Sequence, residues 1–461
     1  MRLPPHEVLK SSLRYLELIA GKVLNKSELE NFVGETVRAY EQHVNRGFIS
    51  YRKSITEAGQ FAALEWEGQG SILRDAFGRE YIDCLGGYGI FSCGINHPRI
   101  VQAVTDQLKR MALNSQELLE PWRAALASLL ADITPGELAC SFFINNGTDA
   151  IEGAIKLARL HTKRNTFLST IGGFHGKSMG ALSLIGKATF REPFAGGLQD
   201  VRFAPYGDAQ ALEAEFAKAA AVGTPFAAFI VEPVQGEAGA IVPPSGYMSQ
   251  ARELCTKHGT LLIVDEVQTG LGRTGAMWGV DHSNVTPDIL CLGKALGGGV
   301  MPLAAFVSTP RIWECMVPNP TIHSTTFGGN PLACVAGIAA ISVTLEEDLP
   351  GQAAAKGQRL LRDLERLRDR YPQLLTAVRG MGFLIGLEFP SDKIGYDCAA
   401  GLFRRGVLVA GTYSKARTIR IEPALGISTA LLDEVMNRLE DTLEEIAIAS
   451  RTPTPSRVAA C

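Results

Sequence analysis

The sequence lacks any block of like charges and carries almost no net charge. Lys and Arg together number 45 and Asp and Glu number 48, so the formal net charge is −3. Proteins that bind nucleic acids or acidic surfaces through charge have a basic excess or basic clusters, and this chain has neither. The composition therefore predicts no nucleic-acid partner.

The sequence also lacks long apolar runs, paired cysteine motifs and internal repeats. Charged residues interrupt every apolar stretch, and the first residues do not contain the apolar core of a secretory signal. None of the nine cysteines forms a C-x-x-C pair and no histidine cluster accompanies them, which predicts reduced thiols and no metal site. We therefore expect a cytoplasmic protein that does not cross a membrane.

What the sequence does contain is enough apolar material for more than one lobe, since 46% of its 461 residues are hydrophobic. We predict a helical arm over residues 1–60, the first part of a small domain over 61–95, a large α/β domain over 96–335 and an α+β continuation of the small domain over 336–450. Residues 451–461, rich in Thr and Pro, are expected to be disordered.

The middle of the chain alternates short apolar runs with helical patterns. The apolar runs predict strands at residues 141–144, 226–231, 261–264 and 288–292. The segments between them predict helices at 149–163, 208–220 and 246–258. Strands that are apolar along their whole length and separated by helices are typical of a parallel sheet covered on both faces. The predicted fold is α/β, with a mostly parallel sheet flanked by helices.

The strongest chemical signal is Asp265, which directly follows the apolar run 261–264. A carboxylate at the end of a buried strand is costly unless it has a partner. In open α/β sheets ligands bind outside the carboxyl ends of the strands, so Asp265 is placed to meet a cationic ring nitrogen. A helix N-cap and a metal-binding Asp are the alternatives that the residue alone leaves open.

A second signal is Lys294, which follows the apolar run 288–292 and precedes three glycines at 297–299. Burial lowers the pKa of a lysine, and a desolvated amine is the nucleophile that imine chemistry needs. The glycines allow a backbone to approach a ligand closely. Taken alone, a solvated lysine in a surface loop is the more ordinary interpretation.

Two weaker clusters complete the pattern. Asn146, Gly147 and Thr148 follow a predicted strand and open a predicted helix, where backbone N–H groups suit a phosphate and plain N-capping is the alternative. Phe174 and His175 stand between glycines, where an aromatic ring can stack on a flat ligand or simply fill the core.

Two glycine motifs point elsewhere but fail on their context. Residues 270–275 fit G-x-G-x-x-G, yet they lie too far from the preceding strand and no clear helix follows them, as a dinucleotide site requires. Residues 176–178 resemble the end of a P-loop, but Ile171 stands where that motif needs glycine. Neither nucleotide site is therefore predicted.

The order of the remaining signals, a phosphate loop, an aromatic, a strand-end Asp and then Lys, is what holding a phosphorylated pyridine aldehyde requires. The chain resembles the class III, or ω-, aminotransferases of pyridoxal-phosphate fold type I. The matching stretches cover nearly the whole chain in order: 146–148, 174–176, 232–237, 265–270, 273–275, 294–299 and 325–331. The resemblance implies a large domain with a mostly parallel sheet, a smaller α+β domain, and pyridoxal 5′-phosphate as cofactor.

The resemblance also implies which residues bind that cofactor: Asn146, Gly147, Thr148, Phe174, His175, Glu232, Asp265, Gln268, Lys294 and Thr326. In such enzymes Lys294 would hold the cofactor as a Schiff base and later carry a proton. Asp265 would pair with the ring nitrogen and Gln268 with the phenolic oxygen. Thr326 would reach a phosphate across a subunit interface, which implies a homodimer with shared active sites; pairing of dimers into tetramers is left open.

For the substrate, the resemblance implies that Arg420 binds a carboxylate and that Glu237 pairs with Arg420 in one half-reaction and releases it in the next. Further matches to the family members that act on putrescine are 41–45, 47–48, 51–54, 83–91, 115–119, 409–412 and 418–423. Asn146 and Asp149 depart from the usual Ser and Glu of the phosphate loop.

The expected reaction is transfer of a terminal amino group from putrescine or cadaverine to 2-oxoglutarate or pyruvate. With putrescine the product, 4-aminobutanal, would cyclise to 1-pyrroline. Ornithine, acetylornithine or 4-aminobutyrate as donor is the alternative within the family. More remote alternatives are an aminomutase or racemase on the same fold and an inactive binding protein.

Overall fold

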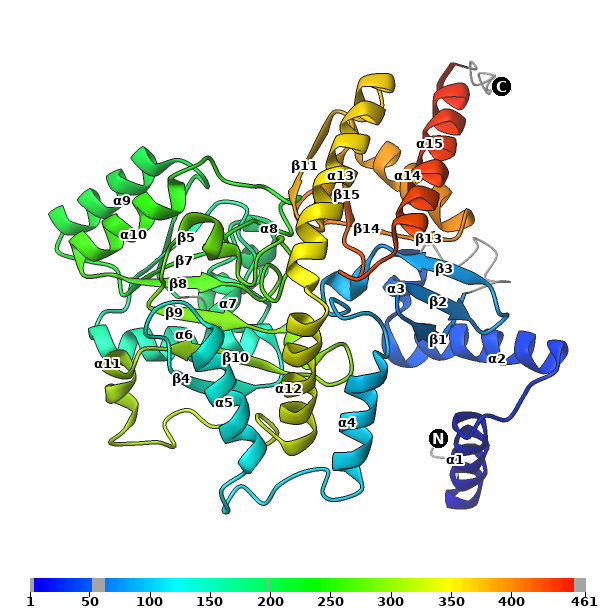
Figure 1. Cartoon of the computed structure of the whole chain (residues 1–461), viewed down its shortest axis with the longest axis horizontal. Helices are drawn as coiled ribbons and strands as arrows, with labels where there is room; N and C mark the ends of the chain where they lie inside the picture. Colours follow the sequence, from blue (N-terminus) through cyan, green and yellow to red (C-terminus); the bar gives the residue numbers. More distant parts are fainter. Residues whose placement is uncertain (1–3, 52–62, 198, 452–461) are drawn as a thin grey trace. The chain divides into compact units, whose positions relative to one another are not determined.

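The computed structural model describes residues 4–51, 63–197 and 199–451 (Figure 1). The chain divides into two compact units, Met1–Glu67 with Leu73–Glu80, and Gly68–Ile72 with Tyr81–Cys461. The predicted disordered tail lies outside the described residues except for Arg451, and so does the end of the predicted arm from residue 52 to 60. The domain boundaries stay predictions.

The first unit begins with the helices that its sequence predicts. They are α1 (Pro5–Ile19), α2 (Lys26–Ala39), a π-helical turn η1 (Tyr40–Asn45) and α3 (Arg46–Tyr51). A capping box starts α2, because Asn25 accepts from the Glu28 amide and Glu28 accepts from the Asn25 amide. Val33 and Val37 of α2 pack with Ile49 and Leu64 into a small separate core. The strands β1 (Glu65–Gln69) and β2 (Ile72–Asp75) follow.

The second unit is built on a seven-stranded sheet with the order β4-β10-β9-β8-β7-β5-β6 (Figure 1). The strands are β4 (Cys140–Ile144), β5 (Phe167–Thr170), β6 (Val201–Ala204), β7 (Ala228–Val231), β8 (Leu261–Asp265), β9 (Ile289–Leu292) and β10 (Ala304–Ser308). All neighbours pair in parallel except β10, which is antiparallel to both β4 and β9. The prediction of a mostly parallel sheet is confirmed; β5, β6 and β10 were not among the predicted strands.

Each face of this sheet packs against its own hydrophobic core, because successive residues of a strand point to opposite faces. In β8, Leu262 and Val264 belong to one core and Leu261 and Ile263 to the other. The first core includes residues of α5 (Pro121–Ile133), α9 (Ala209–Ala221), α10 (Tyr247–His258) and α12 (Pro331–Glu346), and the second includes α6 (Gly147–Thr162). The helices predicted at 149–163, 208–220 and 246–258 are thereby confirmed as α6, α9 and α10.

The C-terminal part of the second unit carries another sheet with its own core. Its order is β11-β12-β15-β14, all antiparallel, from β11 (Ala377–Met381), β12 (Leu384–Glu388), β14 (Ala410–Gly411) and β15 (Thr418–Ile421). Residues of α13 (Leu349–Arg370), α14 (Asp392–Arg404) and α15 (Thr429–Arg451) fill this core together with residues of α4 (Pro98–Leu108) and α12. This arrangement confirms the predicted α+β character of the C-terminal third.

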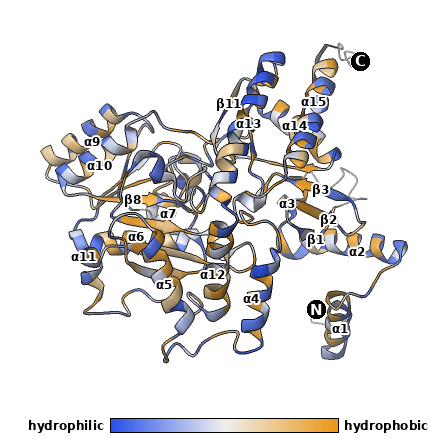
Figure 2. Cartoon of the chain, in the orientation of Figure 1, coloured by the Kyte–Doolittle hydropathy of each residue, from blue (hydrophilic) through white to orange (hydrophobic). Residues whose placement is uncertain are grey.

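The remaining elements of the second unit are short. They are β3 (Glu80–Asp83), whose Ile82 and Asp83 pair in parallel with β13 (Val407–Leu408), and the helices α7 (Met179–Ser183), α8 (Ala188–Arg191) and α11 (Pro310–Trp313). Figure 2 shows the apolar residues concentrated around β8, α6 and α12. No helix within the described ranges is both long and apolar enough to span a bilayer.

Candidate active site

Two neighbouring parallel strands bring Asp265 and Lys294 to the same edge of the large sheet. Strand β8 ends at Asp265, which stands opposite Cys291 of β9. Strand β9 ends at Leu292, two residues before Lys294. Because the carboxyl ends of parallel strands meet at one edge, the carboxylate and the amine leave the sheet at the same end, where α/β folds bind ligands.

Lys294 has an unusual backbone and a perturbed amine. Its φ of +46° lies in the left-handed region, which a residue with a side chain seldom adopts. It opens a short 3-10 turn, η5 (Lys294–Gly297). Burial lowers the pKa of Lys294, although the charges of Glu422 and Glu237 oppose this effect. The amine is therefore neutral and nucleophilic at a lower pH than that of a solvated lysine.

Asp265 is paired with His175 inside the protein. Asp265 Oδ2 lies 2.8 Å from His175 Nδ1, and Asp265 Oδ1 accepts a 3.0 Å hydrogen bond from the amide of Val267. Burial disfavours a charged imidazole, but the hydrogen bond and charge of Asp265, with the charge of Glu232, outweigh it and raise the pKa of His175. His175 Nε2, on the other side of the ring from Asp265, is buried and has no hydrogen-bond partner among the described residues, and a Cβ on Gly173 would lie 3.1 Å from it.

The Glu232 carboxylate binds the backbone beside the pair formed by Asp265 and His175. Its carboxylate accepts hydrogen bonds from the amide of Phe174 at 2.9 Å and from that of Gly236 at 3.1 Å. Burial raises the pKa of Glu232 to about 7. The contacts fix the loop that carries Phe174 and His175, and a direct contact of Glu232 with the cofactor stays a prediction.

The start of α6 confirms that Asn146 acts as an N-cap. Asn146 Oδ1 accepts from the amide of Asp149 at 3.0 Å, and Asn146 Nδ2 donates to Asp149 Oδ2 at 2.8 Å. The two departures from the family pattern, Asn146 and Asp149, therefore contact each other at the start of α6. Binding of phosphate by Asn146 stays a prediction.

Beside that cap the chain forms a narrow cradle lined by small residues. Thr148 Oγ1 lies 2.6 Å from Ser178 Oγ. A Cβ on Gly176 would lie 2.2 Å from Thr148 Oγ1, and one on Gly147 would lie 2.7 Å from the side chain of Val267. A Cβ on Gly293 would lie 3.5 Å from the Gly147 backbone. The loop that opens α6, the end of β8 and the approach to Lys294 therefore lie in direct contact.

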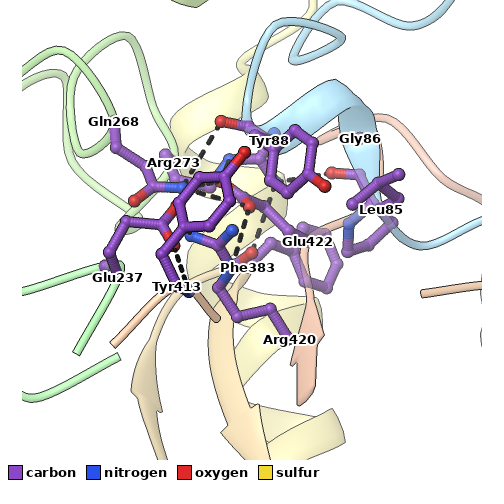
Figure 3. Close-up of polar contacts among 12 residues, drawn as sticks. Leu85, Gly86, Tyr88, Glu237, Gln268, Arg273, Phe383, Tyr413, Arg420 and Glu422 are labelled. Carbon is purple, nitrogen blue, oxygen red and sulfur yellow. Dashed lines mark hydrogen bonds and ion pairs between the residues drawn. The ribbon is translucent and has the colours of Figure 1, made fainter. Parts of the chain in front are cut away.

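The predicted substrate residues form a buried ion pair (Figure 3). Arg420 Nη1 lies 2.8 Å from Glu237 Oε1, and both side chains are almost fully buried. Glu237 Oε2 also accepts a 2.9 Å hydrogen bond from the amide of Tyr413. Burial disfavours the Arg420 charge, but Glu237 and Glu422 raise its pKa above the ordinary value. Arg420 is therefore charged and partly neutralised before any substrate binds.

Gln268 contacts a carboxylate that the sequence analysis did not select (Figure 3). Gln268 Nε2 donates to Glu422 Oε1 at 3.1 Å and to Oε2 at 3.2 Å. Glu422 Oε2 lies 3.9 Å from Arg420 Nε, and Glu422 Oε1 lies 4.0 Å from Arg273 Nε. One signal could have found Glu422: strand residues two apart share a face, so Glu422 had to lie beside Arg420.

Three aromatic rings, two of them also missed from the sequence, connect the two halves of the site. The rings of Phe174 and Tyr413 stack at 5.8 Å, and those of Tyr413 and Tyr88 at 6.2 Å. Arg420 lies 5.4 Å from the Tyr88 ring centre, and Lys177 Nζ lies 4.4 Å from that of Tyr413. The row of rings offers an apolar wall between the loop of Phe174 and Arg420, suited to an aliphatic chain.

Thr326 makes none of the contacts described above. It is exposed, and its backbone carbonyl accepts a 2.8 Å hydrogen bond from Gln116 Nε2. A place in the active site of a second copy of the chain stays a prediction.

Comparison with known families gives one match over most of the chain. Residues 56–443 match the family described as aminotransferase class-III. The match includes every predicted site residue from Asn146 to Arg420.

Solved structures give the same result. An ornithine aminotransferase from Toxoplasma gondii superposes with a TM-score of 0.83 at 28% identity, covering 98% of this chain and 100% of that one. An amine transaminase from an uncultivated Pseudomonas species, solved with its pyridoxal phosphate bound, gives 0.78 at 31% identity, with coverage of 85% and 97%. An acetylornithine aminotransferase from Elizabethkingia anophelis gives 0.75 at 30% identity, with coverage of 90% and 99%.

Proposed function

The chain belongs to the class-III aminotransferases, and on that premise we propose that it transfers the terminal amino group of an unbranched amine to a 2-oxo acid. The observation that carries the proposal is the ion pair between Glu237 and Arg420. A free guanidinium would repel a cationic amine donor, and a guanidinium held by a carboxylate does not. The pair therefore suits donors whose far end is not a carboxylate.

Class-III aminotransferases use pyridoxal 5′-phosphate, and the residues present fit it. The start of α6 offers backbone N–H groups and the Thr148 hydroxyl to a phosphate, and the glycines at 147 and 176 let the neighbouring loops approach it closely. We assign Lys294 to the covalent link, Asp265 to the ring nitrogen, and Gly147 with Thr148 to the phosphate. When bound, the cofactor supplies an electron sink for the negative charge that develops on the substrate carbon.

The chain itself supplies proton transfer and fixed charge. Lys294 has a lowered pKa, so its amine can take the proton from the carbon that bears the amino group and return a proton one position away. Asp265, held by His175 and the amide of Val267, keeps its carboxylate aimed at the ring. A fixed carboxylate in a buried site stabilises a positive ring nitrogen without reorganisation during the reaction.

In the acceptor half-reaction the site must offer a positive charge to the distal end of the 2-oxo acid. A 2-oxo acid such as 2-oxoglutarate carries a second carboxylate, which a guanidinium binds through two parallel hydrogen bonds. The nitrogen atoms of Arg420 make no aligned hydrogen bond within the described ranges. When Glu237 turns away, those N–H groups can bind the acceptor carboxylate.

For the donor, we propose putrescine or a similar diamine, on the likeness of residues 418–423 and the other stretches to enzymes that act on putrescine. Ornithine or acetylornithine is the second candidate, because two similar solved structures are ornithine and acetylornithine aminotransferases. A matrix of amine donors against 2-oxo acids, with trapping of the aldehyde product, tests both. Turnover without any 2-oxo acid would contradict transamination.

Replacing Glu237 with Gln should shift donor preference toward amino acids. Gln keeps the size of the side chain but removes the charge nearest to Arg420, so Arg420 repels a diamine more strongly and binds the carboxylate of glutamate more readily. We expect the ratio of kcat/KM for putrescine to that for glutamate to fall about tenfold. Steady-state assays with both donors measure it, and the control is Glu388→Gln, which removes a carboxylate that pairs with Arg379 and Arg417 and not with Arg420. An unchanged ratio would contradict the exchange of partners.

The proposed active form is a homodimer. Two segments of the second unit expose many apolar side chains: Leu108, Met111, Leu113, Leu118, Leu119, Val317, Ile322 and Phe327. The hydrogen bond from Gln116 to Thr326 joins these segments. Contiguous exposed apolar residues are typical of an interface between subunits. A second copy of the chain covering them would bring Thr326 to the other subunit's cofactor phosphate.

Replacing Leu119 with Arg should therefore separate the subunits. Leu119 is fully exposed, so a charged replacement leaves the folded chain intact and is costly only where a partner buries it. We expect light scattering to show the mass of a monomer and activity to fall by at least about tenfold. The control is Val222→Arg, an exposed apolar residue after α9. A variant that keeps the dimer mass would exclude this surface, and the wild-type mass distinguishes dimers from tetramers.

A further inference from the structure

The carboxylate of Glu422 lies inside the candidate active site, but the proposed reaction gives it no role. Its side chain is fully buried, and Gln268 Nε2 donates to both of its oxygens. Its backbone is fixed as well, because the Glu422 amide donates to the carbonyl of Cys84 at 2.8 Å. A carboxylate in such a place is costly unless positive charge compensates it.

The carboxylate faces the reacting lysine. A Cβ on Gly89, whose φ is +99°, would lie 2.9 Å from Glu422 Oε1, 3.5 Å from Lys294 Cδ and 3.7 Å from Gln268 Cγ. Glu422 and Lys294 therefore both pack against Gly89, where a side chain would clash with the carboxylate. Burial lowers the pKa of Lys294, and Glu422 is the charge that opposes this most strongly.

Two guanidinium groups, those of Arg273 and Arg420, lie beside the Glu422 carboxylate, but hydrogen bonds hold only one of them in place. Arg273 is fully buried and donates to the carbonyls of Phe383 and Pro423 and to Ser92 Oγ. Those hydrogen bonds fix its position. Arg420 has no such set of hydrogen bonds, and its charged neighbours are Glu237 at 2.8 Å and Glu422 at 3.9 Å.

The buried charges at the substrate end therefore balance only when both carboxylates are counted. Arg273 and Arg420 provide two positive charges, and Glu237 and Glu422 provide two negative ones. Glu237 is the member that must move in the proposed reaction. When it does, Glu422 is the anion that stays beside Arg420.

We propose that Glu422 is a specificity-determining residue, the permanent counter-ion of Arg420, which makes the substrate end accept the ammonium of a diamine and hold carboxylates weakly. Because Glu422 neutralises part of the Arg420 charge, Glu237 can attract the distal ammonium of the donor while it stays paired with Arg420. A carboxylate ligand gains less from Arg420, because Glu422 lies on the other side of the guanidinium. The inference deepens the proposed function, since it rests on the movement of Glu237.

The test uses Glu422→Gln in the holoenzyme. Gln has the same shape and still accepts one hydrogen bond from Gln268, so it removes the charge and little else. Glutarate, a dicarboxylate that cannot react, is titrated into the resting enzyme by calorimetry. We expect its Kd to fall by at least about tenfold, and the ratio of kcat/KM for putrescine to that for 4-aminobutyrate to fall by a similar factor.

The matched control is Glu388→Gln. Glu388 of β12 is a largely buried carboxylate of the same C-terminal sheet, and it pairs with Arg379, Arg417 and Lys415 rather than with Arg420. Its loss should leave the Kd of glutarate unchanged. A purely structural part for Glu422, as support for Gln268 and Arg273, predicts lower stability without tighter glutarate binding. A Kd in Glu422→Gln within about twofold of wild type would therefore overturn the inference.

Two further measurements keep the inference testable. If Glu422→Gln does not fold, glutarate is titrated into Glu237→Gln, where Glu422 is intact. We expect a gain of less than about tenfold there, and a larger gain would show that Glu422 does not restrain Arg420. The titration needs no turnover, so it decides the part of Glu422 even if wild-type enzyme fails to use any diamine, a failure that would count against the proposed function alone.

Discussion

Replacing Lys294 with alanine is expected to lower the rate of amino-group transfer by at least about 10³-fold. The variant loses the covalent link to the cofactor and the base that moves the substrate proton, two tasks that no neighbouring side chain can take over. Asp265 is already paired with His175, and Glu422 and Glu237 face guanidinium groups. The loss should therefore appear in kcat and not only in KM.

The measurement combines steady-state rates with the visible absorbance of the purified protein. Lys294→Ala should bind the cofactor without the covalent link, so borohydride should no longer fix the cofactor to the chain. The control is Lys356→Ala in α13. The Lys356 amine donates a 2.8 Å hydrogen bond to the carbonyl of Ile427 and takes no part in the site. Activity near that of wild type in Lys294→Ala would exclude the assignment and leave another lysine to be found.

Replacing Asp265 with asparagine is expected to cost about 10²- to 10⁴-fold in kcat. The side chain keeps its shape but loses the charge that would hold a proton on the ring nitrogen of the cofactor. His175 loses its anionic partner at the same time. Since the charge of Asp265 helps offset burial at His175, the pKa of His175 should fall in the variant.

Two measurements separate these effects. Stopped-flow rates give the loss in the chemical step, and NMR of labelled histidine gives the titration of His175. The comparison variant is Asp288→Asn, which removes a carboxylate paired with Arg252 just before β9, at the other end of the sheet. If Asp265→Asn kept the wild-type kcat while His175 titrated lower, the carboxylate would serve the histidine and not the cofactor.

Much of the large sheet could be predicted from the sequence, because its strands are apolar along their whole length. The run at residues 261–264 has no polar face, which only a strand buried on both sides tolerates. Strand β10 was harder, since Ala304–Ser308 begins with two alanines, which are depleted in strands. Its position between β4 and β9 depends on pairings between segments far apart in the chain, which local patterns do not contain.

The site divides in the same way. Asp265 and Lys294 could be found because each follows a strand, and the strand end itself marks the place of a ligand. Asn146 left two interpretations open, and the capping contact with Asp149 decides what its side chain does here. The contact between Glu422 and Gln268 could not be predicted, because the two residues are 154 positions apart and only the folded chain brings them together.

The left-handed backbone of Lys294 limits how far selection can raise the stability of this protein without loss of activity. Glycine adopts a φ of +46° without strain, whereas a residue with a side chain is about 1 kcal/mol or more worse off there. Selection for thermal stability alone, in nature or in the laboratory, would therefore favour the replacement of Lys294 with glycine. Such a search must demand turnover at every round, because one of its available gains in stability lies at the residue proposed to carry the chemistry.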